Sequence, residues 1–214
     1  MPNTETIRSF YNSYLGKLEK PTERHKFIFQ TLDGLILKNA AVLDIGCGTG
    51  ITSKHLAERA KSVVAIDLSP VLIDFALFNN SNINLQYFVA DIIDWESKTK
   101  FDFIFMIDVF EHIPVESIPA LMGKLKDLSH EKTQIYLNIP SFDVLNYLSQ
   151  HHPDAMQIVD EPHKDVTIYF REIGFYPMYS RLYWGQYIEY LFYPEQMMKN
   201  TFKGIFKSLE KKAS

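Results

Sequence analysis

Short β-rich runs alternate with amphipathic segments from residue 40 onward, and this alternation constrains the fold more than any other feature of the sequence. β-branched and aromatic residues fill the runs 40–45, 61–67 and 82–90, while segments 51–60 and 69–80 have helical periodicity. Strands joined by helical crossovers lie parallel and are covered by helices on both faces. The sequence therefore predicts an α/β fold with a doubly wound, mostly parallel sheet.

The next part of the chain continues the pattern. Two nearly continuous apolar runs, 101–108 and 133–140, are typical of central parallel strands, and segment 114–129 between them has the pattern of a helix. These elements extend the predicted sheet to five parallel strands.

The C-terminal part departs from the alternation. We expect a helix from about residue 165 to residue 173, ended by Gly174, because glycine is favoured just after a helix. Aromatic-rich strands are expected over 174–184 and 185–193, with Gly185 in a tight connection. This antiparallel hairpin at the sheet edge completes a predicted seven-stranded sheet.

Charge and composition narrow the classes of partner. The net charge is -4 and the pI is about 6.0, which disfavours nucleic acid and favours a small-molecule substrate. The polar first ten residues and the lack of a long apolar stretch predict neither a signal peptide nor a membrane span. Cys47 is the single cysteine, so no internal disulfide can form and a reducing, cytoplasmic location is expected.

A glycine-rich turn follows the first predicted strand and holds Gly46, Gly48 and Gly50. It does not match a phosphate-binding P-loop, which needs Lys and then Ser or Thr, or a dinucleotide site, which needs glycine where Ile51 stands. Asp44, two residues before the first glycine, would repel a pyrophosphate and attract an ammonium group. The turn therefore predicts a nucleoside ligand that carries positive charge and no phosphate.

Two more carboxylates end the next two predicted strands. Asp67 closes the second strand at the spacing where an acidic side chain reaches both ribose hydroxyls, and Asp91 closes the third. Because ligands of open α/β sheets bind at the carboxyl edge, we expect both side chains to lie beside the glycine turn.

Together these motifs resemble the class I S-adenosylmethionine-dependent methyltransferases, and the resemblance runs from about residue 11 to residue 193. It implies a Rossmann-like fold, S-adenosylmethionine as cofactor and S-adenosylhomocysteine as product. Asp44 would hold the methionine ammonium, Asp67 the ribose and Asp91 the adenine amino group. Tyr11 and Arg24 would reach the methionine carboxylate; the alternative for Arg24 is a solvated side chain on an amphipathic helix. The positions that the resemblance assigns to the cofactor are Tyr11, Arg24, Asp44, Gly46, Gly48, Asp67, Leu68, Asp91, Ile92, Ile107 and Asp108.

The resemblance also suggests an organisation into three parts of one structural domain. Residues 1–38 would form an N-terminal helical lid, with a break near Pro21. Residues 39–193 would form the Rossmann-like cofactor-binding domain, and residues 194–214 a C-terminal amphipathic helix.

Three residues are candidates for the catalytic side of the site. Residues 108–113 are similar to the Glu-His element of small-molecule and ubiquinone-type O-methyltransferases, and His112 is a candidate general base because imidazole titrates near neutral pH. The alternative is that His112 starts the next helix and orients the loop. Asn138 ends the fifth strand, where its amide could orient an amine or carboxylate. Tyr176 belongs to an aromatic-rich segment that could form part of a wall beside the sulfonium.

Residues 108–113 could instead bind a divalent metal. Asp108, Glu111 and His112 have the spacing to share one face of a helical turn, with His163 as a fourth ligand, as in some ubiquinone-type and RNA 3′-end methyltransferases. Asp108 is one methylene shorter than the Glu usual there. We expect no metal.

Three functions remain compatible with these residues. The leading hypothesis is methyl transfer to an oxygen or nitrogen of a small metabolite. The second is a cyclase of the same fold that converts the cofactor into azetidine-2-carboxylate and methylthioadenosine. The third is a cofactor-binding module without catalysis.

Overall fold

The computed structural model describes residues 4–13, 15–152, 164–200 and 203. Its sheet has seven strands in the order β3-β2-β1-β4-β5-β7-β6. The strands are β1 (Ala41–Ile45), β2 (Ser62–Asp67), β3 (Leu85–Val89), β4 (Phe101–Ile107), β5 (Ser129–Pro140), β6 (Phe175–Tyr183) and β7 (Tyr187–Pro194). β1 to β5 pair in parallel, and β7 pairs antiparallel with both β5 and β6. The predicted fold class is therefore confirmed, including the antiparallel C-terminal hairpin.

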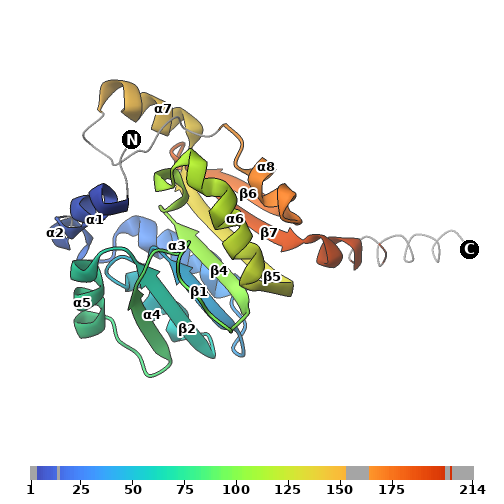
Figure 1. The fold of residues 1–214 in the computed structure, drawn as a ribbon, viewed down its shortest axis with the longest axis horizontal. Coiled ribbons are helices and arrows are strands. Elements are labelled where there is room, and N and C mark those ends of the chain that lie inside the picture. Colours follow the sequence, from blue (N-terminus) through green and yellow to red (C-terminus); the bar gives the residue numbers. More distant parts are fainter. Residues whose placement is uncertain (1–3, 14, 153–163, 201–202, 204–214) are drawn as a thin grey trace, which may run out of the picture.

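Helices cover both faces of this sheet (Figure 1). They are α1 (Thr4–Asn12), α2 (Leu15–Leu18), α3 (Glu23–Leu35), α4 (Ile51–Ala57), α5 (Pro70–Asn79), α6 (Ile118–Asp127), α7 (Phe142–His151) and α8 (Thr167–Glu172), with single 3-10 turns η1 (Phe110–His112) and η2 (Val115–Ser117). One core packs α6 and α8 on one face, and the other packs α3, α4 and α5 on the opposite face. The central strand β4 is buried on both sides, which explains why it is almost entirely apolar.

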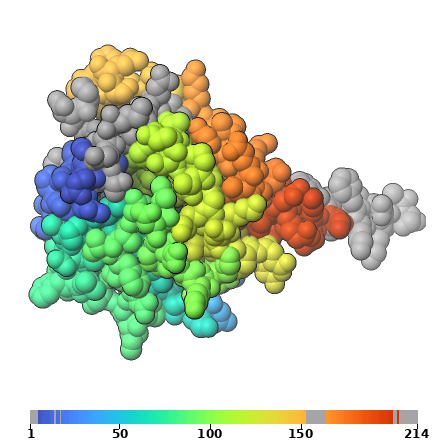
Figure 2. Space-filling model, in the orientation of Figure 1, coloured from blue at the N-terminus to red at the C-terminus, as the bar shows by residue number. Residues whose placement is uncertain are grey.

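The N-terminal helices lie near the end of β2, and the expected helical region with a break is confirmed. Arg8 Nε donates to Leu68 O at 3.1 Å, and Ser69 Oγ donates to Asn12 Oδ1 at 2.6 Å, so α1 is attached to the segment after β2. Thr22 caps α3 just after the predicted break. In the space-filling view, α1 and α2 (dark blue) lie at the left of the face shown and α7 (gold) lies at its top (Figure 2).

The C-terminal hairpin forms where the sequence predicted it. Gly174 has φ 84° directly after α8, and Gly185 has φ 66° in the connection between β6 and β7. Both angles lie in the left-handed region that glycine adopts most readily. Residues 195–200 are helical, while 201–202 and 204–214 of the predicted last helix lie outside the described residues. The three-part division of the chain remains a prediction.

Helix α7 is the main element that the sequence interpretation missed. It follows β5 directly, and its N-cap Ser141 accepts from Val144 N at 3.5 Å. A serine cap followed by an apolar periodic segment is a helix signal that was available in the sequence. None of the described helices combines the length and the apolar character needed to cross a membrane.

Candidate active site

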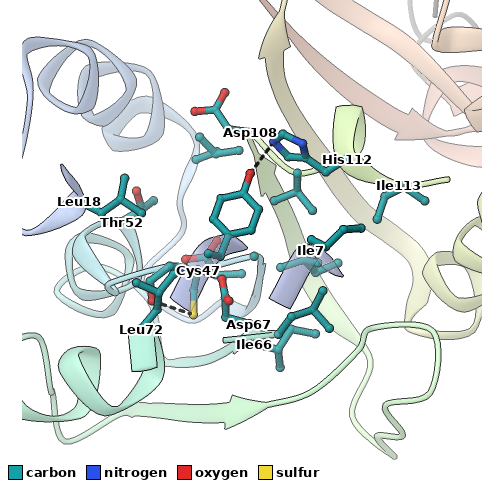
Figure 3. A pocket seen from close by; sticks show the side chains of 18 of the residues that line it. Ile7, Leu18, Cys47, Thr52, Ile66, Asp67, Leu72, Asp108, His112 and Ile113 are labelled. Carbon is teal, nitrogen blue, oxygen red and sulfur yellow. Dashed lines mark hydrogen bonds between the residues drawn. The ribbon is translucent and has the colours of Figure 1, made fainter. Parts of the chain in front are cut away.

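A cavity of about 550 Å³ opens at the carboxyl edge of the sheet. The ends of β1, β2 and β4 form its floor, and α1, α3 and α7 contribute walls. Figure 3 shows Asp67 and Cys47 in one part of this cavity and His112 in another. We call the part around Asp67 the cofactor half and the part around His112 the acceptor half.

The glycine turn forms the base of the cofactor half. Gly46, Gly48 and Gly50 all have positive φ, at 69°, 53° and 78°. Gly46 N donates to Ile66 O at 2.8 Å, which ties the turn to β2. A Cβ at Gly46 would overlap Val109, whereas a Cβ at Gly48 would meet no atom within 4 Å. Gly48 therefore presents bare backbone to open space in the cavity.

Asp67 is oriented by the backbone on both sides. Gly48 N donates to Asp67 Oδ2 at 2.8 Å and Ser69 N donates to Asp67 Oδ1 at 2.8 Å. Burial raises the pKa of Asp67, and these backbone hydrogen bonds oppose the rise. Each carboxylate oxygen keeps a second lone pair, so the side chain can accept two further hydrogen bonds.

Asp44 lies buried beneath the same turn, with 2% of its surface exposed. Its Oδ2 accepts from Ser53 Oγ at 2.6 Å. Burial raises the pKa of Asp44 to about 7, and the charge of Asp67 adds to the rise. A cation bound next to Asp44 would reverse this effect because it favours the ionised carboxylate.

An ion pair between Arg24 and Asp108 lies between the two halves. Both guanidinium Nη atoms donate to the Asp108 carboxylate, with Nη2 to Oδ1 at 2.6 Å. Arg24 Nη2 also donates to Asn138 Oδ1 at 2.6 Å, and Nε donates to the Tyr183 hydroxyl at 3.1 Å. The guanidinium carbon lies 3.8 Å from the ring centroid of Tyr187. These contacts use four of the five N–H groups, so one N–H of Nη1 has no partner among them.

His112 and Tyr11 form a hydrogen-bonded polar pair in the acceptor half. The Tyr11 hydroxyl lies 2.8 Å from His112 Nε2, and the two rings meet edge to face. His112 is 7% exposed and follows Glu111 in η1. Burial, and then the charge of Asp108, raise the pKa of Glu111 well above its ordinary value. Within the described part of the chain, neither Glu111 oxygen has a hydrogen-bond partner, so the neutral acid is favoured.

The metal alternative gains no support from the described residues. No group of three His, Cys, Asp or Glu side chains among them is placed to hold an ion. His163, the predicted fourth ligand, lies outside the described residues. The absence of a metal thus remains a prediction.

Most of the predicted site residues meet in this one cavity. Those that line it are Tyr11, Arg24, Asp44, Gly46, Gly48, Asp67, Leu68, Asp91, Ile92, Ile107, Asp108 and His112. These positions lie between residues 11 and 112, and the fold brings them together at one edge of the sheet.

Asn138 and Tyr176 do not line the cavity, and their expected positions need correction. Asn138 is fully buried behind Arg24, and its amide bonds protein groups. Tyr176 pairs with Tyr193 at the start of β6. Because β6 is antiparallel to β7, it runs in the same direction as β5, so its end at Tyr183, whose hydroxyl bonds Arg24, lies toward the cavity and its start lies away from it. The Tyr176 ring lies 5.9 Å from the Arg171 guanidinium carbon.

Several cavity residues were not predicted. The structure adds apolar side chains from α1, α7 and the loop after β4, namely Ile7, Phe10, Ile113, Pro114, Val144 and Leu148. The helical periodicity of α7 is a sequence signal for Val144 and Leu148. The other positions depend on how distant segments pack.

Comparisons with known proteins agree with this site. A family model described as a methyltransferase domain matches residues 14–198. A ubiquinone biosynthesis O-methyltransferase of Xylella fastidiosa is 40% identical over 82 residues, which cover 36% of this chain and 33% of that protein. Among the curated relatives it matches, the chain spans about a third of the length.

Two solved structures have the same fold. DhpI bound to S-adenosylhomocysteine superimposes with a TM-score of 0.71 at 16% identity, covering 90% of this chain and 97% of the other. The magnesium protoporphyrin IX methyltransferase ChlM from Synechocystis PCC 6803, also bound to S-adenosylhomocysteine, gives 0.67 at 18% identity, covering 88% and 98%. The fold and the glycine turn thus define a Rossmann-like enzyme of the methyltransferase type. The chain belongs to the class I S-adenosylmethionine-dependent methyltransferases, as its sequence motifs predicted.

Proposed function

We propose that this protein transfers the methyl group of S-adenosylmethionine to an oxygen or nitrogen of a small, largely apolar and uncharged molecule, with oxygen favoured. The observation that carries the proposal is the continuity of one cavity, which joins the glycine turn and the Asp67 carboxylate to the pair formed by His112 and Tyr11. Its volume of about 550 Å³ is in the ordinary range for a small-molecule site.

The adenosyl part of the cofactor is assigned to the ends of β2 and β3. Asp67 would accept from the two ribose hydroxyls, because backbone N–H groups already fix the direction of its carboxylate. Leu68 and Ile92 line the cavity nearby and would pack on the adenine ring. Asp91 would accept from the adenine amino group, as in the family.

The methionine part is assigned to the boundary between the halves. Asp44 would hold the ammonium, directly or through water, because a buried carboxylate gains most from a cation. Arg24 would contact the carboxylate through the remaining N–H of Nη1, and Asp108 keeps its guanidinium in place. Ile107, at the end of β4, would lie beneath this part.

The charges of the cavity favour an acceptor without negative charge. Four carboxylates line it, whereas Arg24 is its only Lys or Arg side chain among the described residues and is already paired with Asp108. His25 also lines the cavity, and burial lowers its pKa, so its neutral form is favoured. The added walls from α1 and α7 are apolar, which fits an acceptor with an apolar body.

His112 is the candidate base for an acceptor hydroxyl. When bound, the cofactor supplies a methyl group on a positively charged sulfur, and the protein must align the acceptor with it and exclude water. The Tyr11 hydroxyl shows where an O–H group can meet His112 Nε2, and an acceptor hydroxyl would take that position. His112 would then remove the proton as the methyl group is transferred. The name of the curated Xylella relative supports oxygen as the acceptor atom.

The proposal is tested by following the products of the purified protein. With S-adenosylmethionine and a panel of neutral phenols, enols and amines, we expect S-adenosylhomocysteine to appear only when an acceptor is present. Release of methylthioadenosine from the cofactor alone would instead establish the cyclase. Cofactor binding without any product across the panel would favour the non-catalytic module. No contact in the described residues favours the cyclase or the non-catalytic module. The cytoplasmic location and the absence of a nucleic-acid partner stay predictions.

A further inference from the structure

A chain of buried hydrogen bonds leads from Arg24 into the interior of the sheet. Asn138 Oδ1 accepts from Arg24 Nη2 at 2.6 Å, and Asn138 Nδ2 donates to the Tyr136 hydroxyl at 3.1 Å. The Tyr136 hydroxyl in turn donates to Glu189 Oε2 at 2.6 Å. Asn138, Tyr136 and Glu189 each have 0% of their surface exposed. Burial of a charged carboxylate costs free energy unless it is paired and hydrogen-bonded, so the position of Glu189 calls for an explanation.

The strands bring these residues into line. Tyr136 and Asn138 alternate along β5 and so point to the same face, and the register pairs Asn138 with Glu189 on β7. The next strand pairs Glu189 with Arg181. Arg181 Nη2 lies 2.7 Å from Glu189 Oε1, which offsets part of the cost of burial.

The carboxylate fixes the direction of every bond in the chain. The Glu189 carboxylate, paired with Arg181, accepts from the Tyr136 hydroxyl, so the Tyr136 oxygen is left to accept from the Asn138 amide. The amide therefore has its nitrogen toward Tyr136 and its oxygen toward Arg24 and the Tyr183 hydroxyl, which also donates to Asn138 Oδ1, at 3.0 Å. Arg24 has only donors, so this is the one orientation of Asn138 that it can bond. Burial and the charge of Glu189 raise the pKa of Tyr136, which keeps its hydroxyl protonated and able to donate.

We propose that Glu189 is a positioning residue that orients the Asn138 amide through Tyr136 and thereby holds Arg24 at the methionine end of the cofactor. The inference rests on the proposed role of Arg24 in cofactor binding. It assigns Asn138 and Glu189 to cofactor affinity and not to contact with the acceptor.

The substitution Glu189→Gln tests the direction of these hydrogen bonds, because Gln and Glu have almost the same shape. The Gln oxygen would face the donors Arg181 and Tyr179, and its NH2 group would face Tyr136. Tyr136 would then donate to Asn138, whose amide would have to flip and present its NH2 group to Arg24. We expect the affinity for S-adenosylhomocysteine, measured by calorimetry on the full chain, to fall about tenfold, since Arg24 loses a charged hydrogen bond.

A matched pair of Tyr→Phe variants separates the chain from general packing. Tyr136 and Tyr179 each donate a hydroxyl to Glu189, at 2.6 and 2.7 Å, but only Tyr136 connects to Asn138. We expect Tyr136→Phe to weaken binding by about five- to tenfold and Tyr179→Phe to change it less than about twofold. Equal effects of the two variants would overturn the inference, and Tyr136→Phe carries the test if Glu189→Gln does not fold.

The variant Arg24→Ala links the inference to the function. If Glu189 acts through Arg24, adding Glu189→Gln to Arg24→Ala should cause no further loss of affinity, whereas independent effects would add. Weaker binding by Arg24→Ala together with unchanged binding by Glu189→Gln would overturn the inference alone. Unchanged binding by Arg24→Ala would overturn the role of Arg24 in the proposed function, and the inference with it.

Discussion

The two halves of the cavity are held together in different ways. In the cofactor half, the Asp67 carboxylate is fixed by backbone N–H groups of the glycine turn and of the segment after β2. In the acceptor half, polar groups are fixed by side chains from distant elements, as when Tyr11 of α1 meets His112 after β4. Local backbone geometry therefore defines the cofactor half, while tertiary packing defines the acceptor half.

The largest expected effect belongs to the acceptor half. Replacing His112 by Gln removes the candidate base, and we expect kcat to fall by about 10²- to 10⁴-fold for a protonated acceptor. S-adenosylhomocysteine affinity should change little, because His112 lies in the other half of the cavity. His55→Gln on α4 is the matched control, and it should retain activity because His55 pairs with Asp33 outside the cavity. Full turnover by His112→Gln would remove this residue from the chemistry.

Alanine substitutions at two glycines of the turn distinguish effects on stability from effects on cofactor binding. A Cβ at Gly50 would overlap the Tyr87 hydroxyl and lie 2.9 Å from Ala76 Cβ, at φ 78°. We expect Gly50→Ala to lower the free energy of unfolding by about 2–4 kcal/mol, measured with denaturant.

Gly48→Ala should cost only about 1–2 kcal/mol of unfolding free energy, the penalty for its positive φ, because a Cβ there meets no protein atom. Its Cβ enters the space assigned to the cofactor, so binding should fall much more than stability. Normal cofactor affinity in a folded Gly48→Ala variant would place the ligand elsewhere.

The pH dependence of binding tests the assignment of Asp44. Its pKa is raised to about 7 by burial, so the free protein holds a proton there below that pH. Because an ammonium group favours the ionised carboxylate, cofactor affinity should rise with pH up to about 7 and then level off. We expect about a tenfold rise between pH 6 and pH 8, together with proton release that calorimetry detects as a dependence on the buffer. Both features should disappear in Asp44→Asn; if they persist, another group is titrating.

The smallest effect concerns the wall formed by α7. Leu148 lines the cavity, while Tyr147 beside it is 54% exposed and does not. We expect Leu148→Ala to raise the KM of an apolar acceptor about fivefold through lost apolar contact, with the cofactor KM unchanged. Tyr147→Ala is the control on the same helix. If Leu148→Ala changed the cofactor KM instead, the boundary between the halves would need to be redrawn.

The same contrast explains what the sequence could predict. The strand alternation, the glycine turn and Gly174 after α8 depend on local periodicity and backbone angles, and all three predictions are confirmed. The location of the site at the carboxyl edge of the sheet could also be predicted, since the carboxyl ends of parallel strands must lie together. The sequence could not place Tyr176, because the direction of β6 decides which of its aromatic residues lie near the cavity.

The position of Asn138 and helix α7 escaped prediction for a related reason. Asn138 was expected to face the substrate, but α3 brings Arg24 over it and takes up its amide. Such a contact joins residues far apart in the chain, and no local pattern encodes it. Helix α7 had a local signal at Ser141, yet its place over the cavity depends on tertiary packing.

Calorimetric titration with S-adenosylhomocysteine tests the central claim most directly, when wild type is compared with Asp67→Ala. The exposed Asp74→Ala on α5 serves as the control. We expect wild type and the control to bind equally, and Asp67→Ala to bind with about 1.5–3 kcal/mol less free energy, because two hydrogen bonds to a charged group are lost. A folded Asp67→Ala variant with wild-type affinity would contradict the placement of the ribose at the end of β2.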